Sequence, residues 1–298
     1  MEGPQLVAQP LSKDASPVSC PICRAIVKTV RVCYRSIPIW NCQACDYCFA
    51  TVDEIPGHGN LKDLYEKLYS SSQEYLELLE QASKDGRPDR LGFAEKVFFR
   101  LFPLPIGKGR LLEVGCGAGR FLRLAGRKSW HAEGVEISAV AAAVGQRSGV
   151  RIFCGDLAAY ASHHPERRFD MVTAFEVLEH VPDPVQFLRV LRGVLEPSGY
   201  LFLSVPNLND PFVFLDPRPE TWPPVHLHFF SRKALRKVLT LAGFRPVVVK
   251  ANWVPRATMR QVIRSRVSRA LLRPPLICLR FLRLIDGNQI VALAAPRN

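Results

Sequence analysis

From residue 108 onward, short apolar runs alternate with segments of helical periodicity, and this alternation limits the fold more than any other feature. The runs are rich in Val, Leu, Ile and Phe, whereas segments such as 183–195 and 231–244 space apolar residues three or four apart. The seven runs are RLLEVG, HAEGVEI, VRIFCGD, FDMVTAF, YLFLSVPN, PVVVKANW and QIVALAAP. Strands alternating with helices predict an α/β fold with a mostly parallel, seven-stranded sheet covered on both faces.

A glycine-rich loop follows the first run. In LLEVGCGAGR the alternate glycines are Gly115, Gly117 and Gly119. The dinucleotide fingerprint G-x-G-x-x-G does not fit, because its last glycine would stand where the chain has Arg120. The missing side chains open a slot at the carboxyl edge of the sheet, where open α/β sheets bind ligands. Glu113, just before the loop, would repel a pyrophosphate but suits a cation.

Acidic residues at the ends of the next two runs extend this pattern. Glu136 ends the second run, and its carboxylate can accept hydrogen bonds from both hydroxyls of a ribose. Asp156 ends the third run and can bind an adenine amino group. Together with Glu113, they describe an adenosine with a cationic, amino-acid-like tail, which is S-adenosylmethionine.

Residues 108–250 resemble a class I S-adenosylmethionine-dependent methyltransferase, a Rossmann-like fold. The ExGxGxG motif spans Glu113 to Gly119, and Glu136 takes the place of the acidic ribose-binding residue. A nucleotide-binding or cofactor-free Rossmann-like domain is the alternative, but four elements in register favour the methyltransferase.

The segment FEVLEHVPDP after the fourth run carries the fourth element of the resemblance. In that family this stretch lines the cofactor pocket, which implies that Phe175, Glu176 and His180 lie near the methionine or the methyl group. The predicted cofactor site also includes Asp156 and its neighbour Leu157.

The segment PPVHLHFFSRKAL carries two histidines, His226 and His228, on opposite sides of an extended stretch, so we expect one to face the cofactor. An acceptor that must lose a proton needs a base, and imidazole titrates near neutrality. The segment is similar to the histidine loop of related methyltransferases, and His226 aligns with the catalytic histidine of sugar C-methyltransferases. Pro223 and Val225 replace the Tyr and Glu of those enzymes, which argues against carbanion chemistry. We predict His226 as the base; alternatively, it binds a main-chain carbonyl and fixes the loop.

Four cysteines near the N-terminus have the spacing C-x2-C-x18-C-x2-C. They are Cys20, Cys23, Cys42 and Cys45. This spacing is typical of a zinc ribbon, and four thiolates leave no open coordination position, so the zinc is expected to be structural. Cys48 could replace Cys45, and buried free cysteines are the alternative to a metal site. Similar ribbons precede this catalytic domain in sugar methyltransferases and in some ribosomal RNA guanine methyltransferases.

These patterns divide the chain. The predicted parts are a disordered N-terminus (1–17), a zinc ribbon (18–56), a helical connector (57–107) and the methyltransferase domain (108–298), with a basic helical insertion at 254–285. No leader-like or membrane-spanning apolar run is present in the sequence, so we expect a cytoplasmic protein.

The net charge of +13 is concentrated near the C-terminus, where residues 251–298 hold nine arginines and one acidic residue. Such a patch favours an anionic partner, or peripheral membrane contact through residues 258–285. A solvated helix face is the alternative. We therefore expect methyl transfer to a small anionic acceptor, namely a hydroxyl of a nucleotide- or lipid-linked sugar or related metabolite. The alternatives are an RNA methyltransferase that holds RNA with the ribbon and basic tail, and an inactive binding protein.

Overall fold

The computed structural model describes most of the chain. The described residues are 17–55, 66, 77, 92–103, 109–210, 213, 221–251 and 288–297. The predicted connector is described only at Glu66, Glu77 and residues 92–103, and the predicted N-terminal segment only at Pro17. The predicted basic insertion at 254–285 lies outside the described residues.

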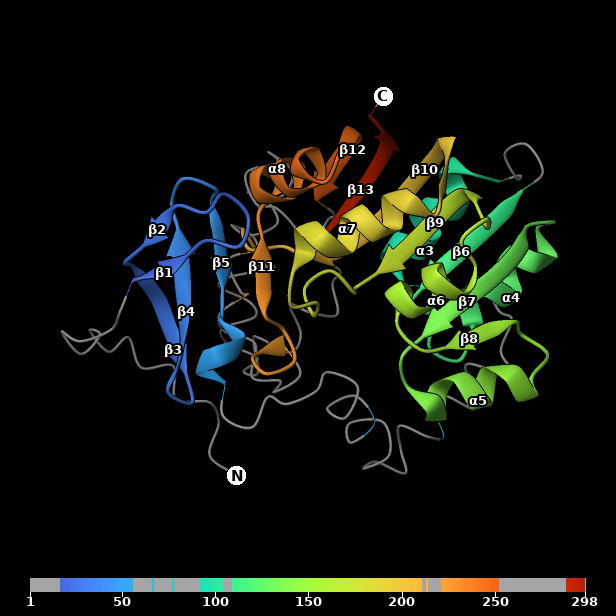
Figure 1. The fold of residues 1–298 in the computed structure, drawn as a ribbon, viewed down its shortest axis with the longest axis horizontal. Helices are drawn as coiled ribbons and strands as arrows, with labels where there is room; N and C mark the ends of the chain where they lie inside the picture. Colours follow the sequence, from blue (N-terminus) through green and yellow to red (C-terminus); the bar gives the residue numbers. More distant parts are fainter. Residues whose placement is uncertain are drawn as a thin grey trace, which may run out of the picture.

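A seven-stranded sheet forms the centre of the larger part of the protein (Figure 1). Its strands are β6 (Arg110–Val114), β7 (His131–Glu136), β8 (Ile152–Cys154), β9 (Phe169–Phe175), β10 (Leu195–Pro206), β12 (Phe244–Ala251) and β13 (Gln289–Pro296). They lie in the order β12-β13-β10-β9-β6-β7-β8, and β13 runs antiparallel to both of its neighbours. The predicted mostly parallel sheet is confirmed. The strand order reverses between β6 and β9, and such a switch point is where open α/β sheets bind ligands.

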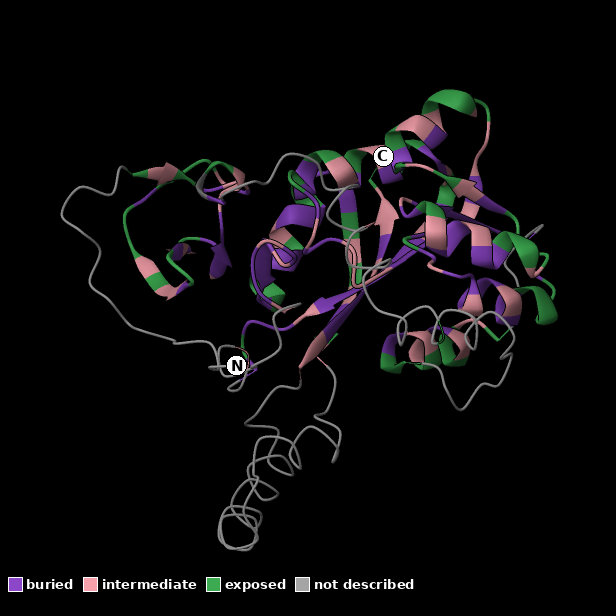
Figure 2. Ribbon diagram, turned by 90° about the horizontal axis from the view of Figure 1, so that it is seen from below, coloured by how far each residue is buried: buried purple, intermediate pink, exposed green. Residues whose placement is uncertain are grey.

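Helices cover both faces of the sheet. One face carries α3 (Phe93–Leu101), α4 (Arg120–Arg127) and α5 (Ala139–Arg147), and the other α6 (Leu157–His163), α7 (Pro184–Gly193) and α8 (Arg232–Leu241). Figure 2 shows the buried residues gathered on the strands and on the inward sides of the helices. None of the described helices is both long and apolar enough to cross a bilayer.

Several helix starts are set by capping side chains near the carboxyl edge of the sheet. Ser138, Asp156, Asp183 and Ser231 each accept a hydrogen bond from a main-chain N–H in the first turn of α5, α6, α7 and α8, respectively. Pro184 occupies the first position of α7, where its missing N–H costs no helical hydrogen bond. These caps bring the functional loops to one edge of the sheet.

A second sheet joins the N-terminal part to the α/β domain. The N-terminal strands are β1 (Val18–Ser19), β2 (Ile26–Val27), β3 (Val30–Tyr34), β4 (Ile37–Cys42) and β5 (Tyr47–Phe49). β1 pairs with β2, whereas β3, β4 and β5 form a sheet whose fourth strand is β11 (His228–Phe230), paired antiparallel to β5. Figure 1 shows β11 beside β5. The ribbon predicted at 18–56 therefore does not stand alone, because its sheet takes a buried strand from the other predicted domain.

Candidate functional site

The glycine loop between β6 and α4 has the backbone that its sequence requires. Gly115, Gly117 and Gly119 have φ angles of 72°, 54° and 74°, a region that L-residues rarely adopt. A Cβ on Gly115 would lie 2.6 Å from Val177, and one on Gly119 would lie 2.7 Å from Val150. A Cβ on Gly117 would meet nothing within 4 Å among the described residues. Two of the glycines permit close packing, and Gly117 faces space that no described residue fills.

Glu136 lies at the end of β7 against this loop. Its Oε2 accepts a hydrogen bond from the Gly117 N–H (2.8 Å), and its Oε1 accepts one from the Ser138 N–H (2.9 Å). Burial raises the pKa of Glu136, and these hydrogen bonds oppose the rise. Glu66 of the predicted connector accepts a hydrogen bond from the Ala139 N–H (2.6 Å), so a connector residue reaches the rim of this site.

Two further predicted cofactor residues differ in exposure. Glu113 is buried at the end of β6, and its Oε2 finds no hydrogen-bond partner among the described residues. Burial raises the pKa of Glu113 well above its usual range. Asp156 is exposed after β8, and its Oδ1 caps α6 by accepting a hydrogen bond from the Ala159 N–H (2.7 Å). Leu157 beside it is buried. The edge of the sheet thus offers one buried carboxylate suited to a cation and one exposed carboxylate.

Phe175 is the last residue of β9, and Glu176 begins the turn that follows. The Phe175 ring packs against Phe121, with 4.9 Å between ring centroids, and so lies in the aromatic core beneath the loop. Glu176 has a φ of 54°, and its Oε1 accepts hydrogen bonds from Ser204 Oγ (2.8 Å) and Gln289 Nε2 (2.9 Å). Both residues shape the turn beside the glycine loop, and their contact with the cofactor stays a prediction.

The next residues are joined to the predicted histidine loop. The Glu179 carbonyl accepts hydrogen bonds from the N–H groups of Leu227 (2.8 Å) and His228 (3.1 Å). In return, His180 Nδ1 donates to the Val225 carbonyl (2.8 Å). These contacts hold the loop against the end of β9, beside the glycine loop.

His226 lies next to His180, with ring centroids 4.7 Å apart and ring planes at 77°. One potential ligand atom from each of Glu179, His180 and His226 lies within 4.8 Å of the others. Glu179 is fully buried, and neither carboxylate oxygen has a hydrogen-bond partner among the described residues. Burial, and then the charge of Glu176, raise the pKa of Glu179, whereas burial lowers that of His180 to about 4. Sequence reasoning named His180 but missed Glu179 beside it, because the sequence does not show that this carboxylate is buried without a hydrogen-bond partner among the described residues.

His228 has a structural environment. Its ring is buried; Nε2 donates to the Val181 carbonyl (2.7 Å), and Nδ1 accepts a hydrogen bond from the Tyr47 hydroxyl (2.5 Å). Burial lowers the pKa of His228 to about 4. The rings of His180 and His228 each bind a main-chain carbonyl, and both roles considered for His226, base or loop-fixing residue, stay predictions.

The four N-terminal cysteines also converge. The sulfur atoms of Cys20, Cys23, Cys42 and Cys45 all lie within 4.8 Å of one another. The Cys23 and Cys42 sulfurs are 3.7 Å apart, close to the ~3.8 Å that tetrahedral Zn–S bonds of ~2.3 Å imply. Cys48 lies outside this cluster and donates to Asn41 Oδ1 (3.5 Å). Of the two ligand sets left open by the sequence, the structure brings together the set with Cys45.

The strand order, the open glycine loop and the carboxylates after the first three parallel strands define a Rossmann-like S-adenosylmethionine-dependent methyltransferase. Residues 79–249 match the sequence profile of the methyltransferase domain family, and the chain belongs to this family. It is a class I S-adenosylmethionine-dependent methyltransferase.

Relatives and solved structures agree with this class. A ubiquinone biosynthesis O-methyltransferase from Aeromonas salmonicida is 34% identical over 106 residues, which cover 34% of this chain and 44% of that protein. The chain thus spans less than half of that relative. A methyltransferase from Archaeoglobus fulgidus has a similar fold (TM-score 0.51, 20% identity, 80% and 100% coverage of the two chains). So does a phosphoethanolamine N-methyltransferase from Haemonchus contortus, solved with S-adenosylmethionine (TM-score 0.57, 16% identity, 81% and 61% coverage).

Proposed function

We propose that this enzyme methylates a hydroxyl group of a small, anionic acceptor of the nucleotide-linked or lipid-linked class. The observation that carries the proposal is the cluster of Glu179, His180 and His226 beside the cofactor loop. A Cβ on Gly115 would lie 2.6 Å from Val177, which is two residues before Glu179. This short distance shows that the glycine loop and the cluster are adjacent. Groups that can take or orient a proton therefore lie next to the proposed methyl donor.

The proposed cofactor contacts follow from the geometry of the loop. S-adenosylmethionine supplies a methyl group that its sulfonium already activates. The open side of Gly117 makes room for it, and Glu136 is placed for the ribose hydroxyls. The buried, unsatisfied oxygen of Glu113 suits the cationic tail, while Asp156 and Leu157 hold the adenine.

The remaining predicted residues surround the methyl group. Phe175 and Glu176 shape the wall of the pocket, and His180 positions the histidine loop through its hydrogen bond to the Val225 carbonyl. A neutral hydroxyl is a weak nucleophile, so the acceptor must lose its proton as it attacks. His226, half-buried beside His180, is the group proposed to act on that proton.

The name of the Aeromonas relative supports an oxygen acceptor, since that protein is an O-methyltransferase of ubiquinone biosynthesis. Its match to this chain covers 44% of its length, so the acceptor of the present enzyme is proposed on the site and on this partial likeness together.

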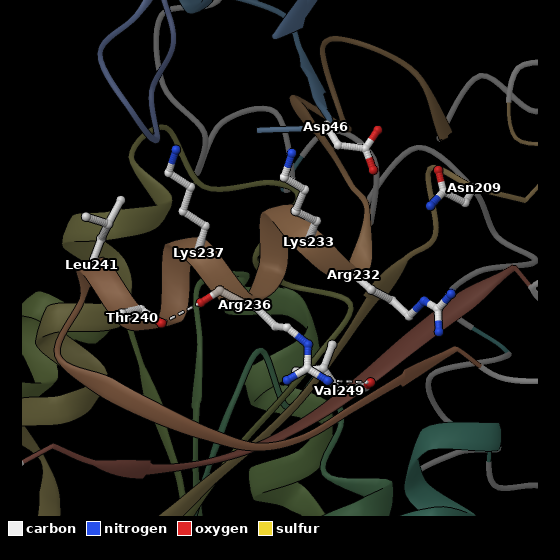
Figure 3. A pocket seen from close by; sticks show the side chains of 9 residues that line it. All are labelled: Asp46, Asn209, Arg232, Lys233, Arg236, Lys237, Thr240, Leu241 and Val249. Carbon is white, nitrogen blue, oxygen red and sulfur yellow. Dashed lines mark hydrogen bonds between the residues drawn. The ribbon is translucent and has the colours of Figure 1, made fainter. Parts of the chain in front are cut away.

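A basic groove supports an anionic acceptor. Four cationic side chains of α8, those of Arg232, Lys233, Arg236 and Lys237, line a groove of about 720 Å³ (Figure 3). Asn209, three residues after β10, also lines it, so one end of the groove lies near the carboxyl edge of the sheet. Cations gathered on one helix face attract phosphate or carboxylate groups.

We also propose that the four clustered cysteines hold a structural zinc ion. Burial raises the pKa of Cys45, and Lys237 of α8 opposes that rise, so a lysine near the cluster offsets part of the negative charge of four thiolates. The zinc would stabilise the sheet that contains β11 and, through it, the histidine loop.

The acceptor class can be tested with methyl-labelled S-adenosylmethionine and fractionated cell extract. We expect label in a ribonuclease-resistant small-molecule or lipid fraction, and His226→Gln to abolish it while cofactor affinity is unchanged. Label that ribonuclease releases would instead identify RNA as the acceptor, contrary to the proposal.

The groove can be tested once the acceptor is found. Arg232→Ala with Lys233→Ala should raise KM for the acceptor at least tenfold with little change in kcat. Arg245→Ala with Lys250→Ala, two exposed cations on β12, removes the same charge elsewhere and is the matched control. An equal effect of both pairs would show that only net charge matters.

A further inference from the structure

We propose that the N-terminal part of the chain positions His226 for the reaction, with Tyr34 and Tyr47 as the positioning residues. Residues 18–50, which contain β1 to β5 and the four clustered cysteines, are called the ribbon below. The contacts between the ribbon and the histidine loop stand on the structure alone. Their effect on turnover rests on the proposed function, in which His226 acts on the acceptor proton.

Trp222 anchors the chain just before His226. Its main-chain carbonyl accepts hydrogen bonds from the N–H groups of Val225 (2.9 Å) and His226 (3.1 Å). Its side chain is fully buried, and its ring stacks on that of Tyr34 at the end of β3, with 4.9 Å between the centroids and 8° between the ring planes. Because aromatic pairs prefer particular geometries, this stack restrains the position of the residue from which the His226 turn is suspended.

Leu227 fixes the chain just after His226. Its N–H donates to the Glu179 carbonyl (2.8 Å), and its own carbonyl accepts a hydrogen bond from the Ala50 N–H (2.9 Å). Ala50 directly follows β5 of the ribbon, and the Leu227 side chain is fully buried. His226 therefore lies between two anchored residues, and each anchor contacts the ribbon.

Tyr47 holds the side chain that comes next, that of His228. The Nε2 of His228 must be the donor in the 2.7 Å contact with the Val181 carbonyl, because a carbonyl oxygen can only accept. In the neutral ring the lone pair is then on Nδ1, and the Tyr47 hydroxyl donates to it. Both rings are buried. Tyr47 is two residues after Cys45, so the turn that carries this cysteine also sets the position of the tyrosine.

The cofactor loop has supports of its own. The Gly117 N–H donates to Glu136, and a Cβ on Gly119 would meet Val150, so these contacts are made within the α/β domain. A shift of the ribbon would reach His226 directly, whereas it would reach the cofactor loop only through the domain core. We therefore expect the ribbon to influence the acceptor step more than the binding of S-adenosylmethionine.

The cysteine cluster connects these contacts to the zinc ion proposed above. Cys42 ends β4, and Cys45 lies in the turn that leads into β5, the strand that carries Tyr47 and pairs with β11. Metal binding to such a small module is coupled to its folding, because four fixed thiolates restrain both turns. Loss of zinc should therefore loosen β5 and, through it, the His226 turn.

Hydrogen exchange tests the positioning without an acceptor. Tyr47→Phe is compared with Tyr160→Phe, which also removes one buried tyrosine hydroxyl, here one that donates to Glu133 (2.6 Å) in the α/β domain. Tyr34→Leu is compared with Tyr34→Phe, which keeps an aromatic ring for the stack. In the first variant of each pair, we expect the main-chain amides of residues 222–228 to exchange at least tenfold faster than in the second. Equal rates within a pair would overturn the role of that tyrosine.

Turnover and cofactor binding separate positioning from a general loss of stability. In Tyr47→Phe and Tyr34→Leu we expect kcat to fall at least tenfold, while the Kd for S-adenosylmethionine stays within twofold of the native value. Removal of the zinc with a chelator should have the same two effects, and added Zn²⁺ should reverse them. An equal loss of turnover and of cofactor affinity would show that the ribbon only stabilises the whole fold, contrary to the proposal.

The positioning and the proposed function can fail independently. Hydrogen exchange needs no acceptor, so native protein that transfers no label to a hydroxyl would refute the proposed function and leave the exchange result unaffected. Conversely, hydroxyl methylation with native kcat in both Tyr47→Phe and Tyr34→Leu would leave the proposed function in place and refute the role of the ribbon.

Discussion

Gly117→Ala tests whether the open side of the glycine loop is the cofactor site. Gly117 has a φ of 54°, and a Cβ there would meet no described atom within 4 Å. The substitution therefore costs only what a left-handed conformation costs an L-residue, about 1–2 kcal/mol. Alanine also makes the unfolded chain less flexible, which offsets up to about 1 kcal/mol of that cost. The net loss in the free energy of unfolding should be about 1 kcal/mol.

Gly149→Ala is a matched control. Gly149, between α5 and β8, has a φ of 77°, and a Cβ there would likewise meet no described atom within 4 Å. Both substitutions thus carry the same conformational cost, and only Gly117 borders the predicted cofactor slot. We expect similar urea midpoints for the two variants, with m-values unchanged.

Calorimetric titration with S-adenosylmethionine should then distinguish them. Gly117→Ala places a methyl group where the cofactor is expected to lie. The Kd of the variant for S-adenosylmethionine should therefore rise at least tenfold, which is a loss of about 1.4 kcal/mol in binding free energy. Gly149→Ala should bind like the native protein. If both variants bind within twofold of each other, the open side of Gly117 is not the cofactor site and the reasoning is refuted.

Three further predictions concern stability and metal content. Tyr47→Phe removes the hydroxyl that donates to Nδ1 of the buried His228, so the free energy of unfolding, measured in urea, should fall by about 1–3 kcal/mol. An unchanged free energy of unfolding would mean that this hydrogen bond is dispensable. Burial raises the pKa of Glu133, but the hydrogen bonds it accepts lower it overall, so the resulting stability is present at neutral pH and lost as pH falls below ~4.5. Arg167→Met should remove about 1–2 kcal/mol at neutral pH, reduced by the partial exposure of the arginine, and should flatten the acid side of the stability profile. Cys45→Ser should abolish the single equivalent of tightly bound zinc, whereas Cys48→Ser should retain it; the reverse result would make Cys48 the ligand.

Local patterns were sufficient for part of the site. The glycine loop and the acidic residue of β7 are separated by a nearly constant stretch of chain, because one strand and one helix must fit between them. The cysteine pairs are similarly local, since each knuckle brings two thiolates together within four residues. Spacing from Cys42 favoured Cys45 over Cys48, and the structure separates the two: Cys45 lies between β4 and β5 with its sulfur in the cluster, whereas Cys48 lies on β5 and donates to Asn41.

The rest of the site required long-range pairing. Glu179 was missed because a carboxylate becomes informative only when burial removes its water and no donor replaces it, and both facts are tertiary. The boundary predicted at residue 56 likewise could not anticipate that β11 pairs with β5.

By itself, the sequence determined the order of strands and helices, the cofactor loop and the cysteine set, because each depends on residues close together in the chain. Only the tertiary structure decided which histidine is held in the interior and which lies beside Glu179. His228 is buried, and its ring is held by hydrogen bonds to Val181 and Tyr47, whereas His226 packs against the ring of His180. These environments arise from contacts between segments 45 to 181 residues apart in the chain. The secondary-structure preference of a single residue contains no information about which distant segment will pack against it.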